Sequence, residues 1–226
     1  MKNILTIITI LLTSLVGNAQ RYYSPNLAVG VKAGTSISKM SFSPSVEQTM
    51  LVGAMGGVTI RYTEEKHFGL IAEINWEQRG WKENFEEHPF SYNRTLTYIQ
   101  IPLLTHIYFG GEKFKGFVNL GPEVGYMIGE SINANFDYNN ISSVAGFPTK
   151  NRMNEQMYTE VSNKFDYGIS AGLGLEFIAK RKHSFLLEAR YYFGIGNIFP
   201  SKKKDTFGAS RGMSIMVTLG YMFRVI

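Results

Sequence analysis

Residues 165–177 read FDYGISAGLGLEF, and this stretch decides the fold. Every odd position carries an apolar side chain, and every even position carries glycine, serine or an acid. A strict period of two is the pattern of a β-strand with one apolar and one polar face. A transmembrane β-strand needs about 9–11 residues. The stretch therefore predicts a strand long enough to cross a bilayer.

The same alternation recurs, with more noise in places, in seven further segments of the chain. Together with the first stretch they predict an all-β fold, an eight-stranded antiparallel transmembrane β-barrel in an up-and-down meander. A soluble β-sandwich or a lipocalin-like barrel is the alternative, because it alternates too. The seven segments are Leu27–Ser36, Val52–Tyr62, Phe68–Arg79, Ile99–Phe109, Phe114–Ile128, Phe185–Phe193 and Met213–Phe223.

The connections between these segments favour the membrane barrel. Those at residues 63–67, 110–113 and 179–183 are short, whereas those at 38–50, 80–94, 129–164 and 194–210 are long. Outer-membrane barrels combine short periplasmic turns with long external loops. The pattern therefore predicts a monomer with four external loops and a periplasmic N-terminus.

Aromatic residues gather on the apolar face near the short turns. Such residues form a girdle at the membrane interface in outer-membrane barrels. The predicted girdle consists of Tyr62, Phe68, Phe109, Phe114, Phe177, Phe185, Tyr221 and Phe223.

Ten charged residues, six acidic and four basic, fall on the polar face. If every strand slipped by one position, these charges would face lipid, at a cost of ~1–4 kcal/mol of folding free energy per charge. The register of the strands is therefore well specified. Because the interior of an eight-stranded barrel is only wide enough for side chains, we expect these charges to pair and plug the pore. The predicted lumen charge network is Lys32, Arg61, Glu73, Glu77, Arg79, Glu123, Asp166, Glu176, Glu188 and Arg190.

Two prolines conflict with the strand pattern. Pro102 and Pro122 fall inside predicted strands, although a closed barrel has no free edge for a residue that lacks an N–H donor. We expect a bulge near each, or an earlier strand start, to absorb the proline.

The N-terminus predicts a secreted protein. Lys2 precedes an apolar stretch from Ile4 to Val16, and small residues suit cleavage after Ala19. Residues 1–19 are therefore expected to be a signal peptide, and residues 20–226 to form the barrel domain. The 226 residues have a net charge of +5 and include no cysteine, which excludes disulfides, a thiol nucleophile and a lipoprotein anchor. No long basic block suggests nucleic-acid binding.

Five motifs follow one another along the chain: WEQRG at 76–80, YIQIPLL at 98–104, GPEVGY at 121–126, DYGISAGLG at 166–174 and the closing GYMF at 220–223. Taken in order, they resemble the PorT-type outer-membrane β-barrel family. The likeness covers essentially the whole predicted mature chain. It implies an eight-stranded barrel inserted by the barrel-assembly machinery, and the family's namesake is an accessory of the type IX secretion system.

Candidate catalytic groups are sparse. His67, His88, His106 and His183 lack metal-ligand spacing, and only His106 falls on a predicted strand, where a hydrogen-bonding role in the lumen is the simpler interpretation. Glycines at 168–174 imitate a phosphate loop, but no lysine follows them and they lie within a strand. We expect no enzyme, cofactor or metal. A small pore and, less favoured, a lipid-modifying enzyme are the alternatives.

The long loops carry aromatic residues that suggest a patch for a partner protein. A mobile, solvated loop is an equally good interpretation. The candidates are Trp81, Phe85, Phe136, Tyr138, Phe147 and Tyr158, with Phe90 and Tyr92 beside them. Lys202–Lys204 is expected to face lipopolysaccharide phosphates. The predicted role is structural or accessory, with outer-membrane lipid, lipopolysaccharide and, in the secretion version, secretion-system proteins as partners.

Overall fold

The computed structural model describes residues 25–86, 88–148 and 152–225. The predicted signal peptide and its cleavage site lie outside these residues. Among the residues described, no helix has the length and apolar character needed to span a bilayer.

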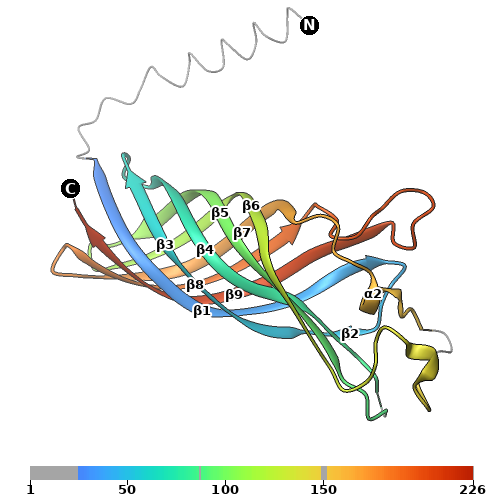
Figure 1. Cartoon of the computed structure of the whole chain (residues 1–226). Coiled ribbons are helices and arrows are strands. Elements are labelled where there is room, and N and C mark those ends of the chain that lie inside the picture. The colour runs from blue at the N-terminus through green and yellow to red at the C-terminus, as the bar shows by residue number, and fades with distance from the viewer. Residues whose placement is uncertain (1–24, 87, 149–151, 226) are drawn as a thin grey trace, which may run out of the picture.

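The regular secondary structure of the described residues is almost entirely β-strand (Figure 1). Two short helices, η1 (Ile141–Ser143) and α2 (Glu155–Tyr158), interrupt the longest connection. The strands are β1 (Asn26–Ser43), β2 (Gln48–Thr49), β3 (Leu51–Thr63), β4 (Phe68–Glu83), β5 (Tyr92–Gly110), β6 (Phe114–Ala134), β7 (Phe165–Ala179), β8 (His183–Gly194) and β9 (Ala209–Arg224).

The long strands close into a barrel. Each pairs antiparallel with its neighbours in the order β4-β3-β1-β9-β8-β7-β6-β5, and the β4–β5 pairing completes the ring. The two-residue β2 pairs with the outer end of β4 and is not part of the ring. The eight-stranded antiparallel barrel is confirmed.

The two ends of the barrel differ. Connections at residues 64–67, 111–113 and 180–182 lie at one end, called here the short-turn end, where Ala28 of β1 also pairs with Arg224 of β9. The other connections lie at the opposite, long-loop end (Figure 1).

Several strands extend farther toward the long-loop end than predicted. β1 runs to Ser43, β4 to Glu83 and β6 to Ala134, and β5 begins at Tyr92 instead of Ile99. In this extension the interior is mostly apolar, as in a soluble protein, whereas deeper in the barrel it is polar. Inward-facing positions are therefore polar in one part of a strand and apolar in the other, so the alternation in the sequence loses its regularity where the extension begins.

Neither proline needs a bulge of its own. On both sides of Pro102, β5 keeps one register with β4 and one with β6. Pro122 pairs in register with Ile169 of β7. The β5–β6 register shifts by one residue at Thr97–Tyr98, four residues before Pro102. The expected bulge at Pro122 is wrong, and β5 does begin earlier than predicted.

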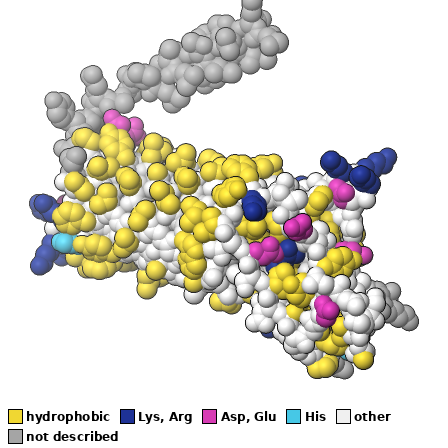
Figure 2. Space-filling view, in the orientation of Figure 1, with side chains coloured by type: hydrophobic (Ala, Val, Ile, Leu, Met, Phe, Trp, Pro, Cys, Tyr) yellow, Lys and Arg dark blue, Asp and Glu magenta, His cyan; other side chains and the backbone are white. Residues whose placement is uncertain are grey.

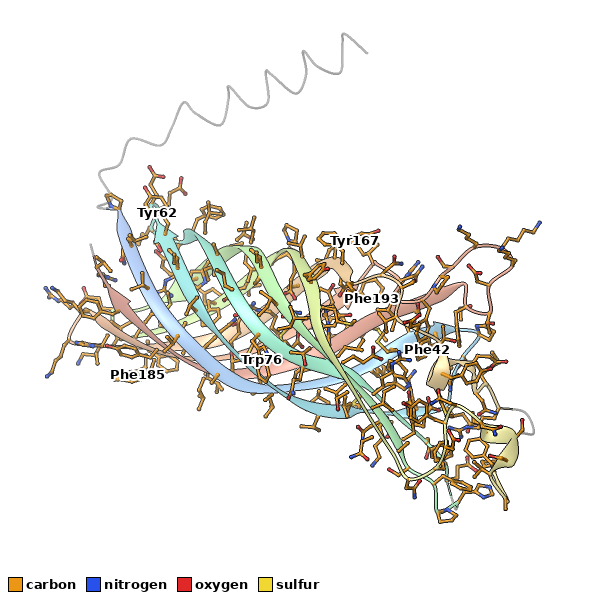
Figure 3. The ribbon with its side chains drawn as sticks, in the orientation of Figure 1. Phe42, Tyr62, Trp76, Tyr167, Phe185 and Phe193 are labelled. Carbon is orange, nitrogen blue, oxygen red and sulfur yellow. The ribbon has the colours of Figure 1, made fainter. Side chains whose placement is uncertain are left out.

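Exposed apolar side chains from all eight long strands cover the outer wall of the barrel, and Figure 2 shows them on one face. Seven residues of the predicted girdle are exposed at the short-turn end, among them Tyr62 and Phe185 (Figure 3). Tyr221 is half-buried instead, because its hydroxyl bonds Nδ1 of His183 at 2.7 Å.

A second aromatic girdle, which the sequence analysis missed, lies toward the long-loop end. Phe177 and Tyr167 stand ten positions apart on β7. At ~3.3 Å per residue and a ~40° tilt they are ~25 Å apart along the membrane normal, the height of the apolar band in outer-membrane barrels. The exposed members of the second girdle are Trp76, Tyr126, Phe165, Tyr167, Tyr191 and Phe193.

Candidate functional site

All ten residues of the predicted lumen charge network lie inside the barrel. Nine are buried, and the side chain of Lys32 is 7% exposed. They are distributed over β1, β3, β4, β6, β7 and β8, so the network joins strands that are distant in the sequence.

Arg190 is the centre of the middle layer. Its Nη1 and Nη2 donate to the two carboxylate oxygens of Glu73 at 2.7 and 3.0 Å. Its Nη2 also donates to both oxygens of Glu188 at 2.9 Å. Lys32 donates to Glu73 from the opposite side at 2.6 Å. Two cations therefore compensate two carboxylates in the middle of the barrel.

A neutral chain extends this layer toward the short-turn end. Asn119 Nδ2 donates to Glu188 at 2.7 Å, and its Oδ1 accepts from His106 Nδ1 at 2.7 Å. His106 is therefore a buried hydrogen-bonding residue of the lumen. The next ion pair is Arg61 with Glu176, a two-pronged contact at 3.0 and 2.7 Å.

The layer toward the long-loop end is built around Arg79. Its guanidinium bonds Asp166 and lies over the rings of Tyr98 and Tyr192, at 4.0 and 4.5 Å from the ring centroids. The Tyr192 hydroxyl also donates to Asp166 at 2.8 Å. Cation–π contacts in a buried site add to the ion pair.

Two carboxylates in this layer lack a direct cation partner of their own. Glu77 accepts from the Ser36 hydroxyl, and its nearest cation is Arg79 at 3.9 Å. Glu123 accepts from the Ser170 hydroxyl. One oxygen of each carboxylate is buried without a hydrogen-bond partner among the described residues. The excess of two acids in the lumen is therefore concentrated near the long-loop end.

Side chains fill the middle of the barrel. The cavity beside Lys32, Glu73, Asn119 and Glu188 has a volume of about 20 Å³. A single water molecule needs a comparable volume. An open aqueous path through this layer would require the ion pairs to separate.

The aromatic residues predicted for a partner-binding patch form a core instead. Trp81, Phe85 and Phe147 are buried, Phe136 and Tyr138 are half-buried, and only Tyr158 is exposed. Phe85 lies 5.7–5.9 Å, centroid to centroid, from the rings of Phe90, Phe136 and Phe147.

These residues belong to a folded unit, called here the outer lobe. It comprises the extensions of the strands, residues 135–148 and 152–164 of the longest connection and the 195–208 connection, and it lies at the long-loop end (Figures 1 and 3). Packing these apolar rings together removes their surface from water, which is favourable. A mobile, solvated loop would leave the same surface exposed. The expected exposed patch is therefore wrong for all of these residues except Tyr158. The buried core of the lobe includes Met40, Phe42, Val46, Trp81, Phe85, Tyr92, Leu96, Met157, Phe199 and Phe207.

A buried acid anchors the long connection to β4. Glu83 accepts from Trp81 Nε1 at 2.9 Å, from Gln156 Nε2 at 3.0 Å and from Arg152 Nη2 at 2.7 Å. Burial raises the pKa of Glu83, and the hydrogen bonds and the Arg152 charge oppose this shift without cancelling it. Arg152 also lies 4.3 Å from the Phe85 ring centroid.

Arg94 makes a second anchor. Its Nη1 donates to the backbone carbonyls of Gln156 and Thr159 at 3.1 and 2.8 Å, and its Nε donates to Glu130. The sequence analysis missed Arg94, Glu83, Arg152 and Gln156. For Arg94 a signal existed, because it continues the inward-facing positions of β5; Arg152 and Gln156 lie in a connection without periodicity.

The described residues contain no cluster of three or more His, Asp or Glu side chains that suits a metal ion. His67 and His183 lie beside the short turns, and His88 lies in the 84–91 connection. His88 therefore lies at the opposite end of the barrel from His67 and His183.

The family model described as outer membrane protein beta-barrel domain matches residues 18–200. Among solved structures, the outer membrane protein OprG from Pseudomonas aeruginosa is 12% identical, with a TM-score of 0.51 over 88% of this chain and 96% of that one. Neisserial surface protein A is 13% identical, with a TM-score of 0.45 over 87% and 97%. The outer membrane enzyme PagL is 13% identical, with a TM-score of 0.38 over 86% and 98%. No curated protein matches.

Proposed function

Because the chain belongs to the outer membrane protein beta-barrel domain family, we propose that it is a non-conducting, non-enzymatic barrel with a structural or accessory role. The ion-paired middle layer supports this proposal most strongly. Arg190, Lys32, Glu73 and Glu188 cross the lumen and leave about 20 Å³ of space beside them. Opening a path would separate buried charges, which costs several kcal/mol per unpaired ion.

The outer lobe supports an accessory role. Its connections are held by a core and by Arg94 and Glu83, so the lobe presents a preorganised surface instead of loops that order on binding. A preorganised surface lowers the entropic cost of association. Lipopolysaccharide and a partner protein are the proposed contacts of this surface, and the barrel-assembly machinery is the proposed partner during insertion.

The specific version of the proposal is participation in type IX protein secretion, as the resemblance to PorT-type barrels implies. The test is deletion of the gene, followed by mass spectrometry of secreted and periplasmic fractions. Periplasmic accumulation of proteins with C-terminal sorting domains is expected. An unchanged secreted profile would overturn the secretion role and leave the barrel itself unaffected.

Single-channel recording of the purified protein in planar bilayers tests the plug. We expect no conductance steps from the wild-type protein, and steps from a variant that removes the crossing charges, such as Arg190→Ala with Glu73→Ala. Steady conductance from the wild type would contradict a plugged lumen.

A small pore is the second candidate. The acid excess at Glu77 and Glu123 favours it, because two carboxylates without their own cations would attract cations. If conductance is found, this arrangement predicts selectivity for cations over anions, measured as the reversal potential in a salt gradient.

A further inference from the structure

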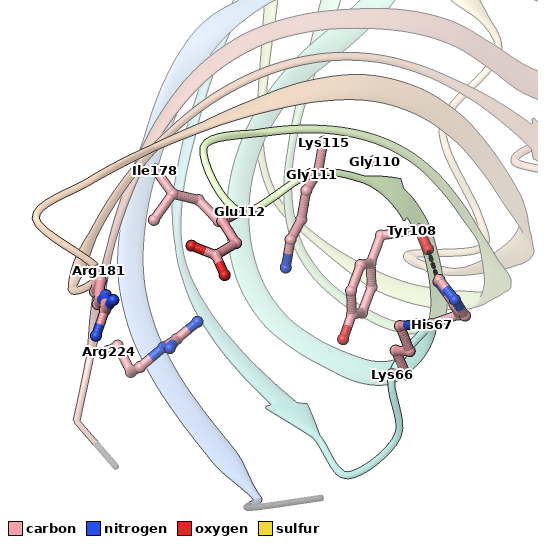
Figure 4. Close-up of a pocket in the computed structure, with 10 residues that line it drawn as sticks. All are labelled: Lys66, His67, Tyr108, Gly110, Gly111, Glu112, Lys115, Ile178, Arg181 and Arg224. Atoms are coloured by element: carbon pink, nitrogen blue, oxygen red, sulfur yellow. Dashed lines mark hydrogen bonds between the residues drawn. The ribbon is translucent and has the colours of Figure 1, made fainter.

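The short-turn end of the barrel contains a cavity of about 410 Å³. The residues that line it come from the β3–β4 turn, from the short-turn ends of β5 and β6 with the turn between them, from the end of β7 and the β7–β8 turn, and from the end of β9 (Figure 4). The charged residues that line it are Lys66, Lys115, Arg181, Arg224 and Glu112. Four cations therefore face one carboxylate.

These four cations differ from those of the lumen. Every lumen cation forms an ion pair, whereas among the described residues Lys66, Lys115, Arg181 and Arg224 form none within 4.0 Å. Glu176 is the cross-strand neighbour of Lys115, but both of its oxygens accept from Arg61. Glu176 is thus already engaged by Arg61.

Lys115 and Arg224 are half-buried. Lys115 Nζ lies 4.3 Å from the Tyr108 ring centroid; Glu176 attracts its charge, whereas Arg61 and Arg224 repel it. Placing like charges in a concave, partly dehydrated site is unfavourable unless an anion compensates them. In Figure 4 the side chains of Lys115 and Arg224 point toward the same space from opposite walls.

The β7–β8 turn adds independent support. Lys180 and Arg181 have φ of 49° and 61°, in the left-handed region that turns usually fill with glycine or asparagine. Basic side chains are thus held at the rim at positions where they strain the backbone. Strained residues of this kind cluster at binding sites.

We propose that this mouth binds a polyanionic phosphate group. Guanidinium and ammonium groups converging from separate elements suit phosphate oxygens, and a volume of about 410 Å³ is typical of small-ligand pockets. In outer-membrane barrels the short turns face the periplasm. The phosphate is therefore that of a soluble periplasmic phosphate ester or of a phospholipid headgroup in the inner leaflet.

The first experiment titrates the full-length folded protein in non-ionic detergent with pyrophosphate, by isothermal titration calorimetry. We expect one saturable site whose affinity falls as salt is added, because exposed charges are screened. Lys115→Gln combined with Arg224→Gln should weaken binding at least about tenfold, since two charge-assisted contacts are lost.

Two matched variants keep the result interpretable. Lys203→Gln with Lys204→Gln removes the same charge at the opposite end and should leave the affinity unchanged. Glu112→Gln removes the competing carboxylate and should tighten binding, which misfolding cannot do. Absence of saturable binding by the wild type, or equal losses in the two double variants, would overturn the proposal.

Nanodiscs distinguish the two sources. If the site takes lipid phosphate, pyrophosphate should bind more weakly in discs with phosphatidylglycerol than in non-ionic detergent, which carries no phosphate, and the difference should disappear with Lys115→Gln/Arg224→Gln. Equal binding in discs and in detergent identifies a soluble phosphate ester.

Discussion

Arg190 bonds both Glu73 and Glu188, two of the six lumen carboxylates, and shares Glu73 with Lys32. Removing one partner of a buried ion pair destabilises a protein more than replacing both partners with apolar residues, because the remaining charge stays buried and uncompensated. The role of this residue in stability can therefore be measured separately from any role in function.

We expect Arg190→Met to destabilise the folded barrel by about 3–5 kcal/mol. Urea unfolding in lipid vesicles, followed by the mobility difference between folded and unfolded protein on gels, measures this. Lys39→Met is the control, because Lys39 is an exposed residue of β1 and its loss should change stability by less than about 0.5 kcal/mol. Equal losses in the two variants would show that the ion pairs do not hold the barrel.

Because Glu83 is buried in the outer lobe, we expect the stability of this lobe to depend on pH. Burial raises its pKa in the folded lobe, so its contribution to stability is full below the unfolded pKa of ~4.3 and is lost as pH rises through the folded pKa. Amide hydrogen exchange of residues 152–158, corrected for intrinsic rates, should show stronger protection at pH 5 than at pH 8. Glu83→Gln should abolish the difference, and a difference that persists in this variant would assign the effect to another group.

At the scale of elements, the outer lobe and the membrane barrel are held by different forces. Aromatic packing holds the lobe, and ion pairs hold the interior of the barrel. The same strands, β4 and β5 above all, supply side chains to both. Because the interactions that hold the two units differ, damage to one unit should leave the other folded even though they share strands.

Phe85→Ala tests this separation. Loss of a buried phenyl ring that contacts Phe90, Phe136 and Phe147 should destabilise the lobe by about 3–5 kcal/mol. Limited proteolysis should then cut the 135–164 connection faster, while the gel mobility of the folded barrel stays unchanged. Tyr158→Ala, at an exposed aromatic residue, should not accelerate cleavage. Loss of the folded barrel band in Phe85→Ala would show that the two units unfold together.

At the scale of the whole molecule, the two aromatic girdles define the depth of each residue in the membrane. Leu173 is 66% exposed and lies near the midpoint of β7 between Phe177 and Tyr167. Val29 lies close to the short-turn girdle, where it pairs with Phe223.

Leu173→Arg should cost about 2–4 kcal/mol of folding free energy in vesicles, and Val29→Arg about 0–1 kcal/mol, because the cost of a charge on the lipid face depends on depth. Denaturant titration of refolding into vesicles measures both. Equal costs would contradict the assigned position of the barrel in the bilayer.

The sequence by itself determined the barrel, its strand number, which face of each strand points inward and where the short turns lie. These follow from local alternation, since a charge on the wrong face of a membrane strand costs several kcal/mol and so leaves a regular trace. Only the tertiary structure decided that the aromatic residues of the long loops form a core, that Arg94 and Glu83 anchor the 135–164 connection, and that four cations converge at the short-turn mouth. Those contacts join residues from separate connections, and packing between distant segments leaves no period in the chain.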